Sequence, residues 1–84
     1  MKITSEHYEH IRERVKPQMS QTGLRYYVQR GLTLRRYVWD CLHAASRDYP
    51  EFRRFLCTDI YGYADDTHID TVLFKIAKEV ELTP

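Results

Sequence analysis

The stretch GLTLRRYVWDCLHAASR, residues 31–47, decides the fold class because it has the pattern of an amphipathic helix with a defined start. Thr33 is of the residue type that caps a helix N-terminus, and Leu32 before it stands in hydrophobic-staple register with Tyr37. One apolar stripe recurs with the helical period: Leu34, Tyr37, Val38, Cys41, Leu42 and Ala45. The opposite side carries Arg36, Asp40, His43 and Arg47. The stretch therefore predicts a helix that packs one face into a core.

Trp39 does not belong to that stripe. At about 100° per residue it lies roughly 130° from the centre of the apolar face. Two interpretations follow. Either the helix is central and packs on two sides, or Trp39 with Arg35 forms an exposed anchor of the kind found at protein interfaces.

Two further helices are predicted before this stretch. Thr4 can cap the first, which Pro17 should kink or end. Its apolar side consists of Tyr8, Ile11, Val15 and Met19. The second spans residues 24–30, between Gly23 as a start and Gly31 as a stop.

Two more helices are predicted after it. One begins near Asp48, which stands three residues before Glu51 as in a capping box, with Pro50 in the first turn. Its apolar residues are Phe52, Phe55, Leu56 and Ile60. The last helix spans about residues 67–81, with Ile69, Val72, Leu73, Ile76, Ala77 and Val80 directed inward.

We therefore predict an all-α fold, a compact bundle of four or five short helices in a single small domain, residues 1–84. The composition, 43% hydrophobic and 30% charged, is that of a globular protein. A chain of 84 residues buries only about 60% of its unfolded surface, so a large enclosed active site is not expected.

The net charge of +1 conceals an uneven distribution. Residues 12–54 carry ten Arg and Lys against four Asp and Glu, whereas residues 59–82 carry two against six. Either the two regions neutralise each other within the fold, or the basic region binds an anionic partner.

The sequence predicts a cytoplasmic protein that does not enter a membrane. No apolar run approaches the ~20 residues that span a bilayer, and Met1–Ile11 lacks the apolar core of a signal peptide. Cys41 and Cys57 lie within helical patterns and without CxxC spacing, which favours two buried thiols over a disulfide or a zinc site.

The segment DDTHID, residues 65–70, gathers three carboxylates and a histidine. Asp65 and Asp66 are placed to cap the last helix, and Asp70 lies in its first turns, where negative charge is favourable. A metal site would need ligands converging on one point, which this spacing does not enforce, so we expect neither metal nor cofactor. The chain also lacks a nucleophile elbow and a glycine-rich phosphate loop, and we predict no enzyme activity.

The helix pair at residues 24–48 raises the alternative of a DNA-binding regulator. Arg35 and Arg36 open the second helix, where a recognition helix contacts bases. Two residues depart from the standard helix-turn-helix: bulky Tyr27 stands where a small residue is usual, and Asp40 stands where an apolar residue is usual.

Seven tyrosines and one tryptophan accompany nine arginines, and these are the residue types enriched in binding hot spots. Tyr26, Tyr27, Tyr49 and Trp39 cannot all be placed on the apolar stripes. With Arg35 and Arg36, they form the predicted interaction surface, which a homodimer could also use.

The segments RYVWD, residues 36–40, and DTHID, residues 66–70, resemble RYxWD and DxHID segments of short bacteriophage and prophage proteins. The resemblance covers about residues 31–80, and no catalytic or binding residue transfers with it. It implies a small protein that binds a host or phage protein, as defence inhibitors and regulators do. The expected function is therefore protein–protein interaction.

Overall fold

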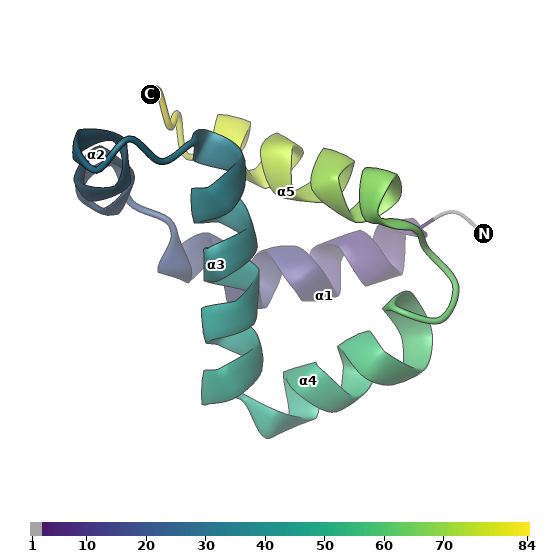
Figure 1. Ribbon diagram of the computed structural model, residues 1–84. Coiled ribbons are helices and arrows are strands. Elements are labelled where there is room, and N and C mark those ends of the chain that lie inside the picture. The colour runs from purple at the N-terminus through teal and green to yellow at the C-terminus, as the bar shows by residue number, and fades with distance from the viewer. Residues whose placement is uncertain (1–2) are drawn as a thin grey trace.

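The computed structural model describes residues 3–84 and has five α-helices, with no strand among those residues (Figure 1). The elements follow in the order α1 (Ser5–Val15), a 3₁₀ turn η1 (Lys16–Gln18), α2 (Gln21–Gln29), α3 (Leu34–Asp48), α4 (Pro50–Phe55), a π-helical turn η2 (Leu56–Ile60) and α5 (Asp66–Glu79). The predicted all-α bundle is confirmed. Met1 and Lys2, on which part of the signal-peptide expectation falls, lie outside the described residues.

Helix α3 is the central element and contacts all four of the other helices. In Figure 1 it crosses the molecule, with α5 and α1 running away from it to one side, α4 leaving its C-terminal end, and α2 on the other side. The interpretation that this helix packs on more than one side is therefore correct.

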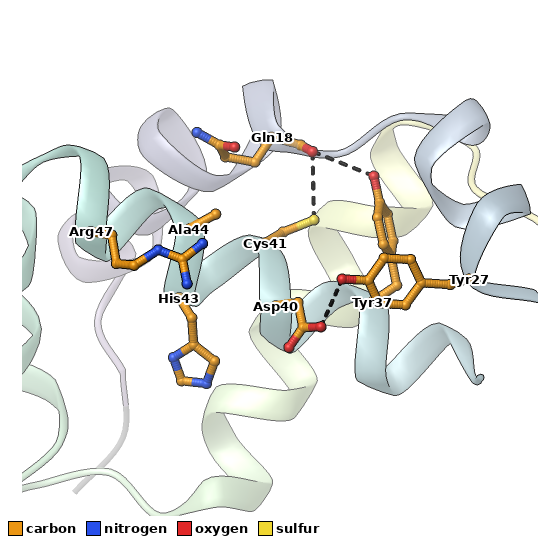
Figure 2. Close-up of a pocket in the computed structure, with 8 residues that line it drawn as sticks. All are labelled: Gln18, Tyr27, Tyr37, Asp40, Cys41, His43, Ala44 and Arg47. Carbon is orange, nitrogen blue, oxygen red and sulfur yellow. Dashed lines mark hydrogen bonds between the residues drawn. The ribbon is translucent and has the colours of Figure 1, made fainter. Parts of the chain in front are cut away.

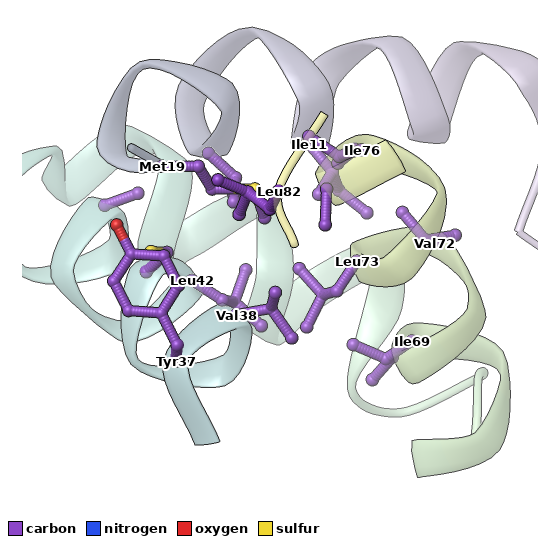
Figure 3. Close-up of a cluster of buried hydrophobic side chains, with 14 of the residues drawn as sticks. Ile11, Met19, Tyr37, Val38, Leu42, Ile69, Val72, Leu73, Ile76 and Leu82 are labelled. Atoms are coloured by element: carbon purple, nitrogen blue, oxygen red, sulfur yellow. The ribbon is translucent and has the colours of Figure 1, made fainter. Parts of the chain in front are cut away.

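A single apolar cluster joins the helices, and Figure 3 shows part of it between α1, α3 and α5. All the predicted inward residues of α3 are buried apart from Leu34, which is half-buried. Helix α1 contributes Ile11 and Val15, and the following turns contribute Met19. No polar or charged residue between positions 3 and 84 is buried, so the interior is held by apolar contact.

Three helix starts agree with the sequence. Thr4 accepts the N–H of His7 at 3.1 Å, and Thr33 accepts the N–H of Arg36 at 3.1 Å. Asp65 accepts the N–H of His68 at 3.0 Å. These bonds satisfy donors that a helix N-terminus would otherwise leave unpaired.

One predicted helix start and one predicted cap are wrong, whereas Pro50 lies in the first turn of α4 as predicted. Helix α2 begins at Gln21 because Ser20 caps it by accepting the N–H of Gly23 at 3.0 Å, which places the glycine inside the helix. Asp48 does not cap α4; it ends α3, and Tyr49 occupies the N-cap without a side-chain bond. The predicted stop at Gly31 is correct, since its φ of 77° is a left-handed value that glycine adopts without strain.

The helices of residues 3–84 are too short and too polar for any of them to span a bilayer. Pro17 lies in η1, directly after α1 ends at Val15, as the sequence predicts.

Candidate functional site

The six residues predicted to form the interaction surface lie in three places around α3. Arg35 and Trp39 lie toward α5, because both bind Asp70. Tyr26 and Tyr27 are residues of α2, and Arg36 lies on the side of α3 that faces α2. Tyr49 is at the C-terminal end of α3, where the Arg14 guanidinium lies 4.2 Å above its ring.

The segments RYVWD and DTHID, on which the predicted phage relationship rests, meet at the first of these places. Trp39 Nε1 donates to Asp70 Oδ1 at 2.9 Å, and Arg35 Nη2 donates to Asp70 Oδ2 at 3.2 Å. Trp39 is half-buried and packs against the core. The indole is therefore half-covered by the core, and its N–H binds Asp70 of α5, whereas its part in an interaction surface stays a prediction.

A second group of side chains connects α2 to α3, and we call it the α2–α3 surface: Tyr26, Tyr27, Arg30, Arg36 and Asp40. The Arg30 guanidinium lies 3.4 Å from the centre of the Tyr26 ring, and the rings of Tyr26 and Tyr27 are 6.4 Å apart. Tyr27 Oη donates to Asp40 Oδ2 at 2.7 Å, and Arg36 Nε donates to the same oxygen at 3.3 Å. Each of these five side chains is thus in contact with at least one of the others.

The bond between Tyr27 and Asp40 explains both departures from a standard helix-turn-helix. The bulky residue of α2 and the charged residue of α3 bind each other, so the helices meet through a polar contact at this point (Figure 2). The hydrogen bond to Asp40, with burial as a second cause, raises the pKa of Tyr27, so its phenol stays neutral and remains a donor.

A pocket of about 380 Å³ opens beside this bond. Figure 2 shows Tyr37 and Cys41 directed toward the main-chain oxygen of Gln18, with His43 and Arg47 farther along α3. Tyr37 Oη lies 3.4 Å and Cys41 Sγ 3.5 Å from that oxygen. The pocket therefore offers an imidazole and a guanidinium to a polar group of a partner.

Cys41 is not suited to act as a nucleophile in this pocket. Burial raises the pKa of its thiol to about 11, which keeps it protonated near neutral pH. Cys57 is exposed, so the prediction of two buried thiols holds for Cys41 and is wrong for Cys57. Cys57 follows Leu56 on the outer side of η2.

The carboxylates of residues 65–70 have separate structural roles. Asp65 is the N-cap of α5, Asp66 lies in its first turn, and Asp70 binds Trp39 and Arg35. His68 Nδ1 lies 3.0 Å from Asp65 Oδ1. Within residues 3–84, no three His, Cys, Asp or Glu side chains converge as metal ligands would.

Two ion pairs join the basic region to the acidic one. Arg12 Nε lies 2.6 Å from Glu79 Oε2, and Arg35 is paired with Asp70. The fold thus neutralises part of the basic region internally. Over the same described part of the chain, no ion pair joins a carboxylate to Arg25, Arg30 or Arg47.

Sequence reasoning missed Asp70, Asp40 and Arg30 as members of these groups. For Arg30 a signal exists, since it follows Tyr26 by four residues, the spacing at which side chains meet on a helix. The same spacing joins Arg36 to Asp40. The bonds of Tyr27 to Asp40 and of Trp39 and Arg35 to Asp70 connect residues distant in sequence, and no local pattern identifies them.

Comparison with protein-family models, curated proteins and solved structures yields no match for this chain. The relationship to phage proteins stays a prediction. The arrangement of the side chains is accordingly the basis for a functional proposal.

Proposed function

We propose that the protein is a small binding protein without catalytic activity, and that it contacts another protein through the α2–α3 surface. The observation that carries this proposal is the continuous series of contacts from Arg30 through Tyr26, Tyr27 and Asp40 to Arg36. Tyrosine and arginine dominate binding hot spots, and side chains already held in place lose less entropy on binding.

Exposure supports the same assignment. Tyr26 is 54% exposed although its ring is stacked under Arg30, so an aromatic face and a cation are presented together. Val28 and Leu32 are also exposed at this end of the molecule, near the turn that follows α2. A partner that covers them would gain apolar burial next to the polar contacts.

The resemblance of RYVWD and DTHID to phage segments supports a mobile-element context. In that context the partner is a host or phage protein of the cytoplasm. The neutral thiol of Cys41 and the structural roles of Asp65 and Asp70 support a role without metal, cofactor or covalent chemistry.

Affinity capture with matched variants tests the proposal. The immobilised wild-type protein, Tyr26→Ala and Tyr63→Ala would be exposed to host lysate, and retained proteins would be quantified by mass spectrometry. Tyr63 is 58% exposed and lies in the turn before α5, so its loss removes a similar side chain elsewhere. We expect a protein that wild type and Tyr63→Ala retain and Tyr26→Ala loses. Equal retention by all three would contradict the proposal.

DNA binding through the helix pair at residues 24–48 is the alternative. Residues 21–40 contain four arginines and one carboxylate, which favours an anionic partner. Against it, Arg35 and Arg36 are each paired with an aspartate. Phosphate binding would make duplex affinity fall steeply with salt and weaken in Arg35→Ala/Arg36→Ala. Absence of duplex binding at low salt would exclude this alternative.

A further inference from the structure

The pocket beside the Tyr27–Asp40 bond is enclosed by three elements of the fold. Gln18 of η1 and Tyr27 of α2 form two of its sides, and α3 forms its floor (Figure 2). Its volume of about 380 Å³ is large enough for a side chain of a partner. Tyr37 and Cys41 in the floor are each only 5% exposed, so packing holds that part of the pocket in place. The pocket is therefore formed before any ligand enters it.

The floor of the pocket has a charge at each end and room between them. Asp40, Ala44 and Arg47 are four and three residues apart, so they lie along one side of α3. The middle residue has only a methyl group, and Figure 2 shows the Arg47 guanidinium directed along the helix toward it. The Asp40 carboxylate is already bound to Tyr27 and Arg36. Within residues 3–84, no carboxylate is paired with Arg47, so its positive charge is available to a ligand.

These groups favour a carboxylate over a phosphate. The planar guanidinium of Arg47 can bind either group through two parallel hydrogen bonds. A phosphate monoester carries close to two negative charges at neutral pH, and Asp40 at the other end of the floor would repel it more than a singly charged carboxylate. His43 lines the same pocket and offers a further N–H donor, with its ring centre 6.2 Å from that of Trp39. The Tyr27 ring provides an apolar side for methylene groups.

We propose that this pocket binds the side-chain carboxylate of an aspartate or glutamate of the partner protein, in an ion pair with Arg47. The inference rests on the proposed function and names the chemistry of the partner. Tyr27 and Asp40 belong both to the pocket and to the α2–α3 surface, so a partner on that surface reaches the pocket. Arg47 then distinguishes an acidic side chain from its amide, because only the acid pairs with the guanidinium.

Nuclear magnetic resonance titration of the ¹⁵N-labelled protein tests the pocket without the partner. The probes are acetyl-glutamate amide, its neutral analogue acetyl-glutamine amide, and inorganic phosphate, all at constant ionic strength. Acetyl-glutamate amide should give saturable shifts of the main-chain N–H signals of Cys41, Ala44 and Arg47. Arg47→Gln should weaken this binding about fivefold, the effect of one partly exposed ion pair. Arg25→Gln is the matched control, since Arg25 is also without a carboxylate partner in the described chain and lies outside the pocket.

Equal shifts with acetyl-glutamine amide, or an Arg47→Gln protein that binds the acid as the wild type does, would overturn the inference. Tighter binding of inorganic phosphate would also overturn it, because the pocket would then prefer the other anion. The unshifted signals of each variant establish that the fold is retained. Failure here is distinguishable from failure of the proposed function: lysate capture that Tyr26→Ala loses, with no saturable shift in the titration, would remove only the carboxylate site.

Discussion

Trp39 of α3 and Asp70 of α5 are joined by a 2.9 Å hydrogen bond from the indole N–H to the carboxylate, although 31 residues separate them. The same carboxylate binds Arg35 through its other oxygen at 3.2 Å. The indole therefore stabilises the contact between two helices. This gives α3 a second packing side and accounts for an aromatic residue that lies off its apolar stripe.

Replacement of Trp39 by Ala should lower the free energy of unfolding by about 2–3 kcal/mol, less than the ~3–5 kcal/mol of a fully buried aromatic residue because the indole is half-buried. Trp39→Phe keeps most of the apolar contact and loses the N–H bond, so it should cost about 1 kcal/mol. Urea unfolding of both variants measures these effects. A Trp39→Ala protein as stable as the wild type would show that the contact contributes little.

Gly23 lies against Tyr37, and a second prediction concerns this close approach. A Cβ atom at position 23 would overlap with Tyr37 Oη and lie 3.0 Å from Cζ. Tyr37 Oη cannot easily move away, because it accepts the N–H of Ser20 at 2.9 Å. We expect Gly23→Ala to lower stability by about 1–3 kcal/mol, although alanine is the better helix former.

Tyr37→Phe provides the control, because it removes the oxygen that the new methyl group would meet. The hydroxyl bonds are lost in that variant, so it should itself be destabilised by about 1 kcal/mol. Gly23→Ala should then cost less in the Tyr37→Phe background than in the wild type, which chemical unfolding of the four proteins measures as a coupling energy. If the two losses of unfolding free energy are simply additive, the methyl group at position 23 does not contact the Tyr37 hydroxyl.

The helices can be predicted because their signals are local. Apolar residues at the helical period identify α1, α3 and α5, and Thr4, Thr33 and Asp65 are caps whose partners lie three residues away. Signals at such short range do not depend on how the helices pack. For the same reason Gly31 is recognisable as a stop.

The candidate site can be predicted only in part because its contacts are tertiary. Tyr27 and Asp40 each stand out in the sequence, but their bond depends on the angle at which α2 meets α3. The predicted start of α2 is wrong because a glycine in a sequence often marks a helix boundary. In the structure Gly23 lies inside α2, and its lack of a side chain leaves room for Tyr37. Helical periodicity predicts which face of its helix a residue occupies. It does not predict which residue of another helix lies against that face.

The third prediction concerns Asp65, which caps α5 with its side chain. Asp65→Ala removes the acceptor for the His68 N–H and should cost about 0.5–2 kcal/mol. Asp66→Ala should cost less, since Asp66 lies in the first turn and contributes mainly through the helix dipole. Thermal unfolding of both variants measures the difference.

The same measurement with divalent ions distinguishes capping from metal binding. If Asp65 acts as a cap, neither added Mg²⁺, Ca²⁺ or Zn²⁺ nor a chelator should change the melting temperature, because a ligand that bound the folded state would raise it. A melting temperature that rises with one of these ions would contradict the capping role and indicate a metal site at residues 65–68.

The fourth prediction follows from Glu79, whose carboxylate connects α5 to α1. Its hydrogen bond from Arg12 at 2.6 Å, with a second from Tyr8 at 2.8 Å, lowers the pKa of Glu79 below its ordinary value of 4.5. A carboxyl group with a lowered pKa in the folded state stabilises that state above the ordinary value, and the contribution disappears as pH falls through the lowered pKa. Stability should therefore decrease when the pH is taken below 4.5.

Glu79→Gln isolates this contribution, because the amide is close in shape and does not titrate. Wild type should be the more stable protein above the ordinary carboxyl pKa, and the difference should vanish at the acid end, where Glu79 is protonated in both states. Urea unfolding at a series of pH values measures it. Glu13→Gln is the matched control, since Glu13 projects outward from α1 and has no ion pair within residues 3–84. The wild type and Glu79→Gln could instead differ in stability by the same amount at every pH. That result would show that the Arg12 and Tyr8 bonds do not stabilise the charged carboxylate.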